Sequence, residues 1–315
     1  MLSGFRRFTK THVLKRCLAG RFNEKSVFIQ ASSPRSGSTL LSQVLQAIPK
    51  TCVLFEPEHA EFVPEANAAK FSQQAYVDPN QRWPEGEAFL RRAFSGRVIN
   101  KWTVSQMSVR DVLAKRTIIK LVRANRLLPW ICRIFQIAPP VLLIRHPCAV
   151  VASQLKYHWN ITQRPEVPPH LEKYTQFKSA IAKMHAPEEL LTVDWALDQH
   201  VALNQPQPHP CTIITYEDLL LRPEPIIAKI AKSWNVEINM DLAMSRLRKP
   251  SSTVSKSGIK GISGWKKNLT HQQVSRILGI AKEFGLGFYT TDAEPDYATI
   301  YGKQLAANVP KAAAA

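Results

Sequence analysis

Short apolar runs alternate with segments of helical periodicity along most of this chain. In residues 39–48, for example, Leu40, Leu41 and Val44 begin a series at the three- and four-residue spacing of a helix with one buried face. Such alternation predicts strand–helix–strand units and therefore the α/β class, with a mostly parallel central sheet flanked by helices. The predicted strands are residues 26–31, 52–55, 97–102, 141–145 and 211–216.

Prolines add helix starts and loops to this outline. Pro147 suits the first turn of a helix that runs to about Tyr157, and Pro223 suits the start of another helix. Residues 58–87 and 163–170 contain proline without clean periodicity, so we interpret both stretches as surface loops or lids over a binding site.

The chain is strongly basic, since 42 Lys and Arg against 24 Asp and Glu give a formal charge of +18 over 315 residues. Such an excess favours a polyanionic partner: a phosphorylated cofactor, nucleic acid, an acidic membrane or an acidic glycan. The basic start predicts a solvated helix before the first strand, with a transit peptide or a membrane-surface helix as alternatives. We therefore expect a basic extension over residues 1–25, one domain over 26–290 and a C-terminal tail over 291–315.

Several protein classes are disfavoured. No run approaches the roughly 18 apolar residues of a membrane span, so we expect a soluble, cytoplasmic protein whose only membrane contact would be peripheral, through the basic N-terminus. The five scattered cysteines contain no Cys-x-x-Cys, and the nine histidines contain no pair at metal-ligand spacing. We therefore expect reduced cysteines and no metal site.

The turn after the first predicted strand carries an anion-binding pattern, Ser-Ser-Pro-Arg-Ser-Gly-Ser-Thr, over residues 32–39. Gly37 permits a tight turn, after which the first amides of a helix point at an anion. The side chains that add a planar cation and hydroxyl donors are Arg35, Ser36, Ser38 and Thr39. One alternative is a serine-capped helix start with an incidental arginine, and another is a triphosphatase loop, although Ser38 stands at the position of its lysine.

A second turn of this kind follows the fourth predicted strand. Arg145 lies at the end of that strand, where open α/β sheets place ligands. Ser153 lies about two turns along the next helix and is able to face the same crevice. Taken singly, a helix-capping arginine and a packed serine explain these two residues as well.

Together the two turns resemble the sulfotransferases that use 3′-phosphoadenosine 5′-phosphosulfate (PAPS). Residues 34–39 are similar to the loop that binds the 5′-phosphosulfate, in the arginine-bearing form of carbohydrate and tyrosylprotein sulfotransferases. Arg145-His-Pro, with Ser153 eight residues later, resembles the 3′-phosphate element. The resemblance implies a P-loop-like fold, PAPS as co-substrate without a metal, and Arg35 at the bridging oxygen. The residues it implies at the 5′-phosphate are Ser36, Gly37, Ser38 and Thr39.

Two further segments fit this resemblance. Tyr216 opens a Tyr-Glu-Asp-Leu sequence like the family's signature, whose tyrosine lies near the adenine, although a strand end followed by helix-capping acids is an alternative. Residues 256–269 are similar to the C-terminal cofactor segment, but Gly264 stands where cytosolic members have Asp, and Lys-Ser-Gly replaces Arg-Lys-Gly. Which lysine reaches the 3′-phosphate therefore stays open. The implied cofactor contacts in this segment are Lys256, Gly258, Trp265 and Lys266.

Sulfuryl transfer needs a base for the acceptor's proton, an in-line approach and cations for the leaving phosphate. Glu56 follows Arg35 by 21 residues in a Phe-Glu-Pro context, which resembles the catalytic glutamate of carbohydrate and tyrosylprotein sulfotransferases. Glu58 and His59 are alternative bases, and an ordinary acid at a strand end is the plainer alternative.

Lys101 ends the third predicted strand, where cytosolic sulfotransferases have Lys-Thr-His. Thr103 stands in place of that histidine, which again favours Glu56 as the base. The resemblance implies that Lys101 stabilises the transferring sulfuryl group, although a solvated lysine at a strand end is the alternative.

The predicted function is transfer of a sulfuryl group from PAPS to a hydroxyl or amine of an acceptor that the sequence does not identify. Candidate acceptors are a glycan, a small molecule, a lipid or a peptide, and the motif style suggests a carbohydrate. One alternative is a P-loop-type small-molecule kinase, which the absent loop lysine disfavours. The other is a non-enzymatic basic module that binds anions. We expect no nucleic-acid partner because no nucleic-acid-binding motif is present. The oligomeric state stays open.

Overall fold

The structure is a computed structural model that describes residues 2–71, 75–157, 172, 174–204, 211–249 and 261–307. In this part of the chain, parallel strands form one sheet in the order β2-β3-β1-β4-β5. The strands are β1 (Val27–Ser32), β2 (Thr51–Phe55), β3 (Arg116–Leu121), β4 (Val141–Ile144) and β5 (Thr212–Thr215). The prediction of an α/β protein with a parallel central sheet is confirmed.

One predicted strand is wrong. Residues 97–99 lie outside the sheet, and the chain turns from residue 100, where Asn100 Oδ1 accepts hydrogen bonds from the backbone N–H groups of Trp102 (2.8 Å) and Thr103 (3.0 Å). The sheet instead uses β3, a buried run with two adjacent isoleucines. The other four predicted strands each overlap a strand of the sheet.

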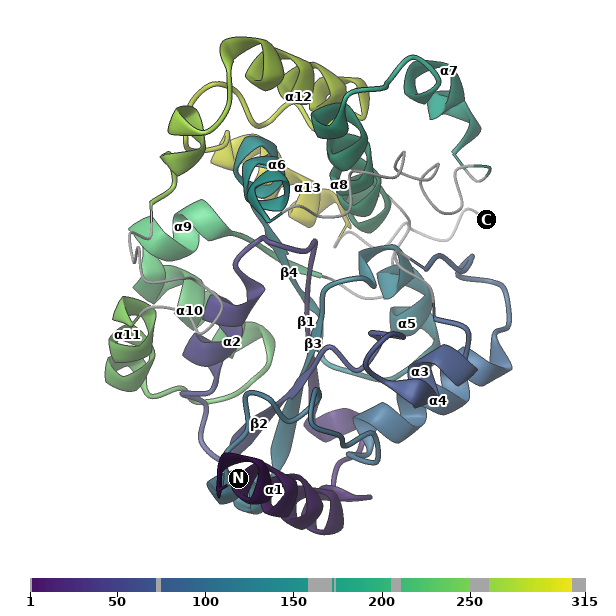
Figure 1. The fold of residues 1–315 in the computed structure, drawn as a ribbon. Helices are drawn as coiled ribbons and strands as arrows, with labels where there is room; N and C mark the ends of the chain where they lie inside the picture. The colour runs from purple at the N-terminus through teal and green to yellow at the C-terminus, as the bar shows by residue number, and fades with distance from the viewer. Residues whose placement is uncertain are drawn as a thin grey trace, which may run out of the picture.

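Helices cover both faces of the sheet (Figure 1). Alternate residues of β1 enter different cores, since Val27 and Ile29 belong to one and Phe28 to the other. The helices that pack on the Phe28 side are α2 (Ser38–Leu45), α10 (Pro223–Ser233) and α11 (Met240–Arg248). The helices that contribute to the opposite core include α1 (Leu2–Leu18), α4 (Pro84–Phe94), α5 (Leu128–Ile134) and α8 (Pro187–Asn204).

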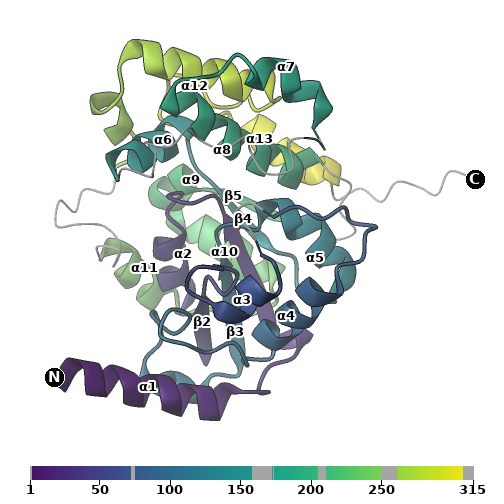
Figure 2. The same cartoon turned by 45° about the vertical axis from the view of Figure 1, so that its right-hand side comes forward.

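The helix starts predicted from proline are confirmed, because α6 (Pro147–Lys156) and α10 begin at Pro147 and Pro223. In Figure 2, α6, α8 and α12 (His271–Glu283) form a layer at one end of the molecule, while α1 lies at the other. The remaining α-helices of the described chain are α3 (Pro64–Ala68), α7 (Lys178–Ile181), α9 (Tyr216–Leu221) and α13 (Tyr297–Ala307).

The basic N-terminal segment is helical, as predicted, and it packs against the body of the protein. Leu14 and Leu18 of α1 are fully buried. Lys10 Nζ donates hydrogen bonds to the carbonyl oxygens of Val104 (3.1 Å) and Met107 (3.0 Å). One basic side chain of α1 therefore ties the helix to the turn that follows residue 100. No helix in the described residues has the length and apolar character to cross a membrane.

The interpretation of residues 58–87 as a surface loop is wrong in part. This stretch contains α3 and the start of α4, and Val63, Ala66 and Phe71 lie in the hydrophobic core. Alanine and valine supplied buried contacts here without a regular period, which is why the pattern looked like a loop. The other proposed loop, residues 163–170, lies outside the described residues.

Candidate active site

Residues from all five strand ends meet at one edge of the sheet. The turn after β1 carries Arg35, and Glu56 directly follows β2. Lys120 is the penultimate residue of β3, Arg145 follows β4, and Tyr216 follows β5. The carboxyl ends of parallel strands share an edge, which is where open α/β sheets bind ligands. The fold therefore gathers the residues of separate motifs into one region.

The turn after β1 has the backbone that its sequence predicts. Gly37 has a left-handed φ of 92° and directly precedes α2, and Tyr216 packs so closely against it that a Cβ at residue 37 would collide with the ring. The Ser36 hydroxyl is buried and has no hydrogen-bond partner among the described residues. A buried, unpaired donor beside the first turn of a helix fits an anion site.

Gly37→Ala is expected to destabilise the protein by more than about 1 kcal/mol, because alanine meets both the left-handed backbone and the Tyr216 ring. Gly285→Ala is the matched control, since Gly285 has a φ of 73° with open space around its missing Cβ. Chemical denaturation of both variants measures the difference. Equal destabilisation would show that the Tyr216 contact contributes nothing.

Arg35 and Arg145 lie side by side at this edge of the sheet. Arg35 Nε donates to Ser153 Oγ (3.0 Å), and Arg145 Nη1 donates to the backbone oxygen of Arg35 (3.2 Å). The Arg145 guanidinium also lies 4.1 Å from the centre of the Tyr216 ring. Its Nε is buried without a partner in the described part of the chain. Four residues from three sequence motifs are thus in mutual contact.

The residue after Arg145, His146, is held by a set of buried side chains. The His146 backbone N–H donates to Glu217 Oε1 (3.0 Å), and Tyr289 donates its hydroxyl to Glu217 Oε2 (3.0 Å). Burial lowers the pKa of His146 to about 4, so its ring is neutral at pH 7, and it stacks on Trp265 at 4.5 Å. Trp265 therefore reaches these buried side chains next to Arg145, and Lys266 follows it on the surface. Lys256 and Gly258 lie outside the described residues.

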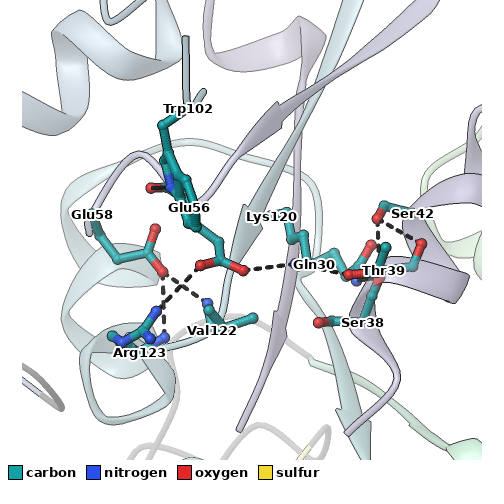
Figure 3. A network of polar contacts seen from close by, with 10 residues as sticks. All are labelled: Gln30, Ser38, Thr39, Ser42, Glu56, Glu58, Trp102, Lys120, Val122 and Arg123. Carbon is teal, nitrogen blue, oxygen red and sulfur yellow. Dashed lines mark hydrogen bonds and ion pairs between the residues drawn. The ribbon is translucent and has the colours of Figure 1, made fainter. Parts of the chain in front are cut away.

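Glu56 is the centre of a buried ionic cluster (Figure 3). Its Oε1 lies 2.8 Å from Lys120 Nζ and its Oε2 lies 3.2 Å from Arg123 Nη1. Lys120 Nζ also donates to Thr39 Oγ1 in the first turn of α2 (3.3 Å). Glu56 has a left-handed φ of 42°, a strained conformation for a glutamate and one that recurs at functional sites. The cluster joins the candidate base to the anion-binding turn.

The lysine that contacts the candidate base is Lys120, whereas the sequence had suggested Lys101. Residues 97–102 lie outside the sheet, so Lys101 does not end a strand, and its side chain is exposed. Lys120 is almost fully buried, and burial lowers its pKa. The sequence contains a sign of this role, because a lysine within the apolar run of β3 needs an opposite charge or a hydrogen-bond acceptor once it is buried.

A profile described as "Sulfotransferase family" matches residues 27–239, which is more than half of the chain. The chain belongs to the sulfotransferase family. It is therefore an enzyme that transfers sulfuryl groups. A search of curated proteins finds no match.

Solved structures similar to this sulfotransferase include two sulfotransferase domains. One is from the Synechococcus PCC 7002 olefin synthase (16% identity, 82% of this chain and 94% of that chain, TM-score 0.45). The other is from the curacin biosynthetic pathway (18% identity, 92% and 100% coverage, TM-score 0.43). A mouse sulfotransferase complexed with PAP is also similar (14% identity, 89% and 90% coverage, TM-score 0.43).

Glu58, the first alternative base of this sulfotransferase, braces the turn after β3. Its Oε1 accepts hydrogen bonds from the backbone N–H groups of Val122 (2.8 Å) and Arg123 (3.3 Å). Burial and, secondarily, the charge of Glu56 raise the pKa of Glu58 to about 7. His59, the other alternative, packs against Phe62 and Trp102, and burial lowers its pKa. These contacts favour a supporting role for Glu58.

The gain in unfolding free energy of Glu58→Gln over the unmodified sulfotransferase is expected to increase as pH rises. A carboxyl whose folded pKa is raised from 4.5 to about 7 favours folding below pH 4.5 and loses that contribution as pH climbs through 7. Glutamine does not ionise, so its advantage in unfolding free energy should grow by roughly 3 kcal/mol between about pH 4.5 and pH 8. Urea titrations at both pH values measure it, and a pH-independent difference would contradict the raised pKa.

A buried network anchors the turn after β1 to α8. Ser33 Oγ donates to Asp198 Oδ2 (3.0 Å) and accepts from Gln199 Nε2 (2.7 Å). Asp198 pairs in turn with the fully buried Arg126 (2.9 Å), which also pairs with Asp194 (2.6 Å). Sequence patterns gave no prediction of this network, although Asp194 and Asp198 stand one turn apart among buried apolar residues of α8.

In the described residues, no three His, Cys, Asp or Glu side chains lie where they could share a metal ion. All five cysteines are free thiols, and Cys17 is exposed while the others are buried.

Proposed function

We propose that this sulfotransferase uses PAPS and transfers its sulfuryl group to a hydroxyl, or an amine, of an acceptor. The observation that supports this most strongly is the contact between the two arginine-bearing turns, in which Arg145 reaches the backbone of Arg35 while Arg35 reaches Ser153. Two adjacent turns that each carry an arginine suit a ligand with phosphate groups at both ends. The unpaired Ser36 hydroxyl and Arg145 Nε are buried donors of the kind that such a ligand requires.

Different residues of the site would bind the different groups of PAPS. Arg35 and the turn residues Ser36, Gly37, Ser38 and Thr39 would hold the 5′-phosphosulfate. Arg145 and Ser153 would hold the 3′-phosphate. Tyr216, packed on Gly37 and under Arg145, offers a flat surface beside them for the adenine. The C-terminal contacts that stay predictions are Lys256, Gly258, Trp265 and Lys266.

When bound, PAPS would supply the sulfuryl group, with 3′,5′-diphosphoadenosine as the leaving group. Glu56 accepts the proton of the acceptor hydroxyl as the new S–O bond forms and the bond to the leaving phosphate breaks. Lys120, which touches both Glu56 and Thr39, is placed to hold negative charge on the transferring group, a role that we assign to it in place of Lys101. Arg35 stabilises charge on the leaving phosphate from the other side of the turn.

The test is nucleotide-dependent thermal stabilisation. At a concentration 100-fold above its dissociation constant, 3′,5′-diphosphoadenosine (PAP) should stabilise the protein by about 2.7 kcal/mol, and raise its melting temperature by roughly 5 °C or more. ATP with Mg²⁺ should not do so. Arg145→Ala should remove most of the effect. Stabilisation by ATP–Mg²⁺ and not by PAP would favour the kinase alternative and overturn the proposal.

The acceptor class is a finer part of this proposal. Resemblance of the Arg35 turn and the Glu56 context to carbohydrate sulfotransferases is the reason to put a carbohydrate first among the candidates. A screen of labelled PAPS against glycans, phenols, lipids and peptides identifies the class by the product that carries the label.

A further inference from the structure

Two buried polar side chains, Asn125 and Tyr174, have no hydrogen-bond partners among the described residues. Asn125 is 1% exposed, and neither its amide oxygen nor its amide nitrogen is hydrogen-bonded to any described residue. The Tyr174 hydroxyl is likewise buried and unpaired within the described ranges. Native proteins rarely leave such groups unsatisfied, so three unpaired atoms indicate that something outside the described chain pairs with them.

The placement of these residues links them to the reaction. Asn125 lies two residues after Arg123, whose guanidinium holds Glu56 Oε2. Tyr174 lies within electrostatic reach of Arg126 and Asp198. Asp198 in turn accepts the hydroxyl of Ser33 in the turn after β1. Asn125 therefore follows closely on the residue that holds the candidate base, and Tyr174 lies beside the network that anchors the turn after β1.

Among the described residues, this region offers no surplus of positive charge beside Tyr174. Arg126 already pairs with two carboxylates, Asp194 at 2.6 Å and Asp198 at 2.9 Å. The unpaired groups are the Asn125 amide and the Tyr174 hydroxyl, each of which can both donate and accept a hydrogen bond. The Tyr174 ring packs edge to face against Tyr76, with ring centres 5.7 Å apart. A hydroxyl also donates and accepts, whereas a carboxylate or sulfate only accepts and would need a cation.

We propose that Asn125 and Tyr174 bind neutral hydroxyl groups of the acceptor adjacent to the one that is sulfated, so that the acceptor is an uncharged polyol. This rests on the proposed sulfotransferase reaction and narrows its acceptor. A site that pairs buried groups with substrate hydroxyls discriminates strongly against analogues that lack them, because the protein groups are then left unpaired. Acceptors with a single hydroxyl should therefore be poor substrates.

The test uses the full chain with two panels of probes. One panel contains neutral polyols: mono- and disaccharides and myo-inositol; the other contains single-hydroxyl compounds: cyclohexanol, phenol and 2-naphthol. Saturation-transfer NMR with PAP present measures binding, and transfer from labelled PAPS measures kcat and KM. We expect saturable binding of at least one polyol, with KM for it raised at least 10-fold by Tyr174→Phe and by Asn125→Leu and with kcat changed much less. Tyr297→Phe, a tyrosine whose hydroxyl bonds Glu294, is the matched control and should leave KM unchanged.

Thermal stabilisation by PAP, measured on the same samples, separates the possible failures. If PAP fails to stabilise even the unmodified protein, the proposed function itself is wrong. If PAP binds but no polyol does, if single-hydroxyl compounds bind as well as polyols, or if Tyr174→Phe leaves KM unchanged, this inference is wrong while the proposed function stands. Should Asn125→Leu fail to fold, Tyr174→Phe, which removes a single oxygen atom, decides the outcome.

Discussion

Replacing Glu56 with glutamine is expected to lower kcat by roughly 10²- to 10⁴-fold, the range typical of a lost general base. Glutamine keeps the shape of the side chain and an oxygen for Lys120, but it does not accept the acceptor's proton. Binding of PAP should persist, because Arg35, Arg145 and Ser153 make their contacts without Glu56. Acceptor-dependent release of PAP from PAPS measures the rate, and PAP-induced stabilisation measures binding.

Glu61→Gln is the matched control for this substitution. Glu61 is an exposed glutamate five residues further along the same segment, so its loss should leave kcat within a factor of about two. Glu58→Gln separates the two buried carboxylates. If Glu56→Gln kept full activity while Glu58→Gln lost it, Glu58 would be the base and the assignment made here would be reversed.

Replacing Lys120 with methionine is expected to lower kcat by roughly 10²- to 10³-fold, as for the loss of a donor that stabilises transition-state charge. Lys120 is the cation that contacts both Glu56 Oε1 and Thr39 Oγ1. The same substitution leaves Glu56 buried beside Arg123 alone, and breaking a buried ion pair on one side destabilises proteins by roughly 3–5 kcal/mol. Activity and unfolding free energy therefore have to be measured together.

A double variant separates the two effects of this substitution. Lys120→Met with Glu56→Gln removes both charges, so it should recover part of the lost stability but none of the activity. Lys101→Met distinguishes the two candidate lysines, because Lys101 is exposed in a turn. Loss of activity in Lys101→Met, with Lys120→Met active, would restore the role that the sequence had suggested for Lys101.

The contrast between these two lysines shows where sequence reasoning failed. Residues 97–102 contain the short apolar pair Val98-Ile99 and looked like a strand, but the Asn100 side chain turns the chain by bonding two backbone amides. The true strand, β3, carries a lysine that interrupts its apolar run. A charged residue makes a run of sequence look unlike a buried strand unless an oppositely charged partner can be identified. Here that partner is Glu56, which lies 64 residues away in the sequence.

Local information was sufficient for several other features. The turn after β1, the helix starts at Pro147 and Pro223, and the parallel sheet depend on neighbouring residues: a glycine with left-handed φ, prolines that preset φ, and the spacing of apolar side chains. Arg35, Ser153 and Tyr216 lie close together, as the sequence led us to expect, because strand ends in a parallel sheet meet at one edge.

By itself, then, the sequence determined the α/β class and the glycine-bearing turn before α2, since short-range sterics and hydrophobic spacing specify both, and its motifs carried the family resemblance. The tertiary structure alone decided that Lys120 and Arg123 hold Glu56, that Glu58 braces their turn, and that Asp198 and Arg126 anchor Ser33. Those pairings join residues distant in the chain. They form because a charge removed from water needs an opposite charge or a hydrogen bond nearby, and only the folded backbone determines which one is within reach.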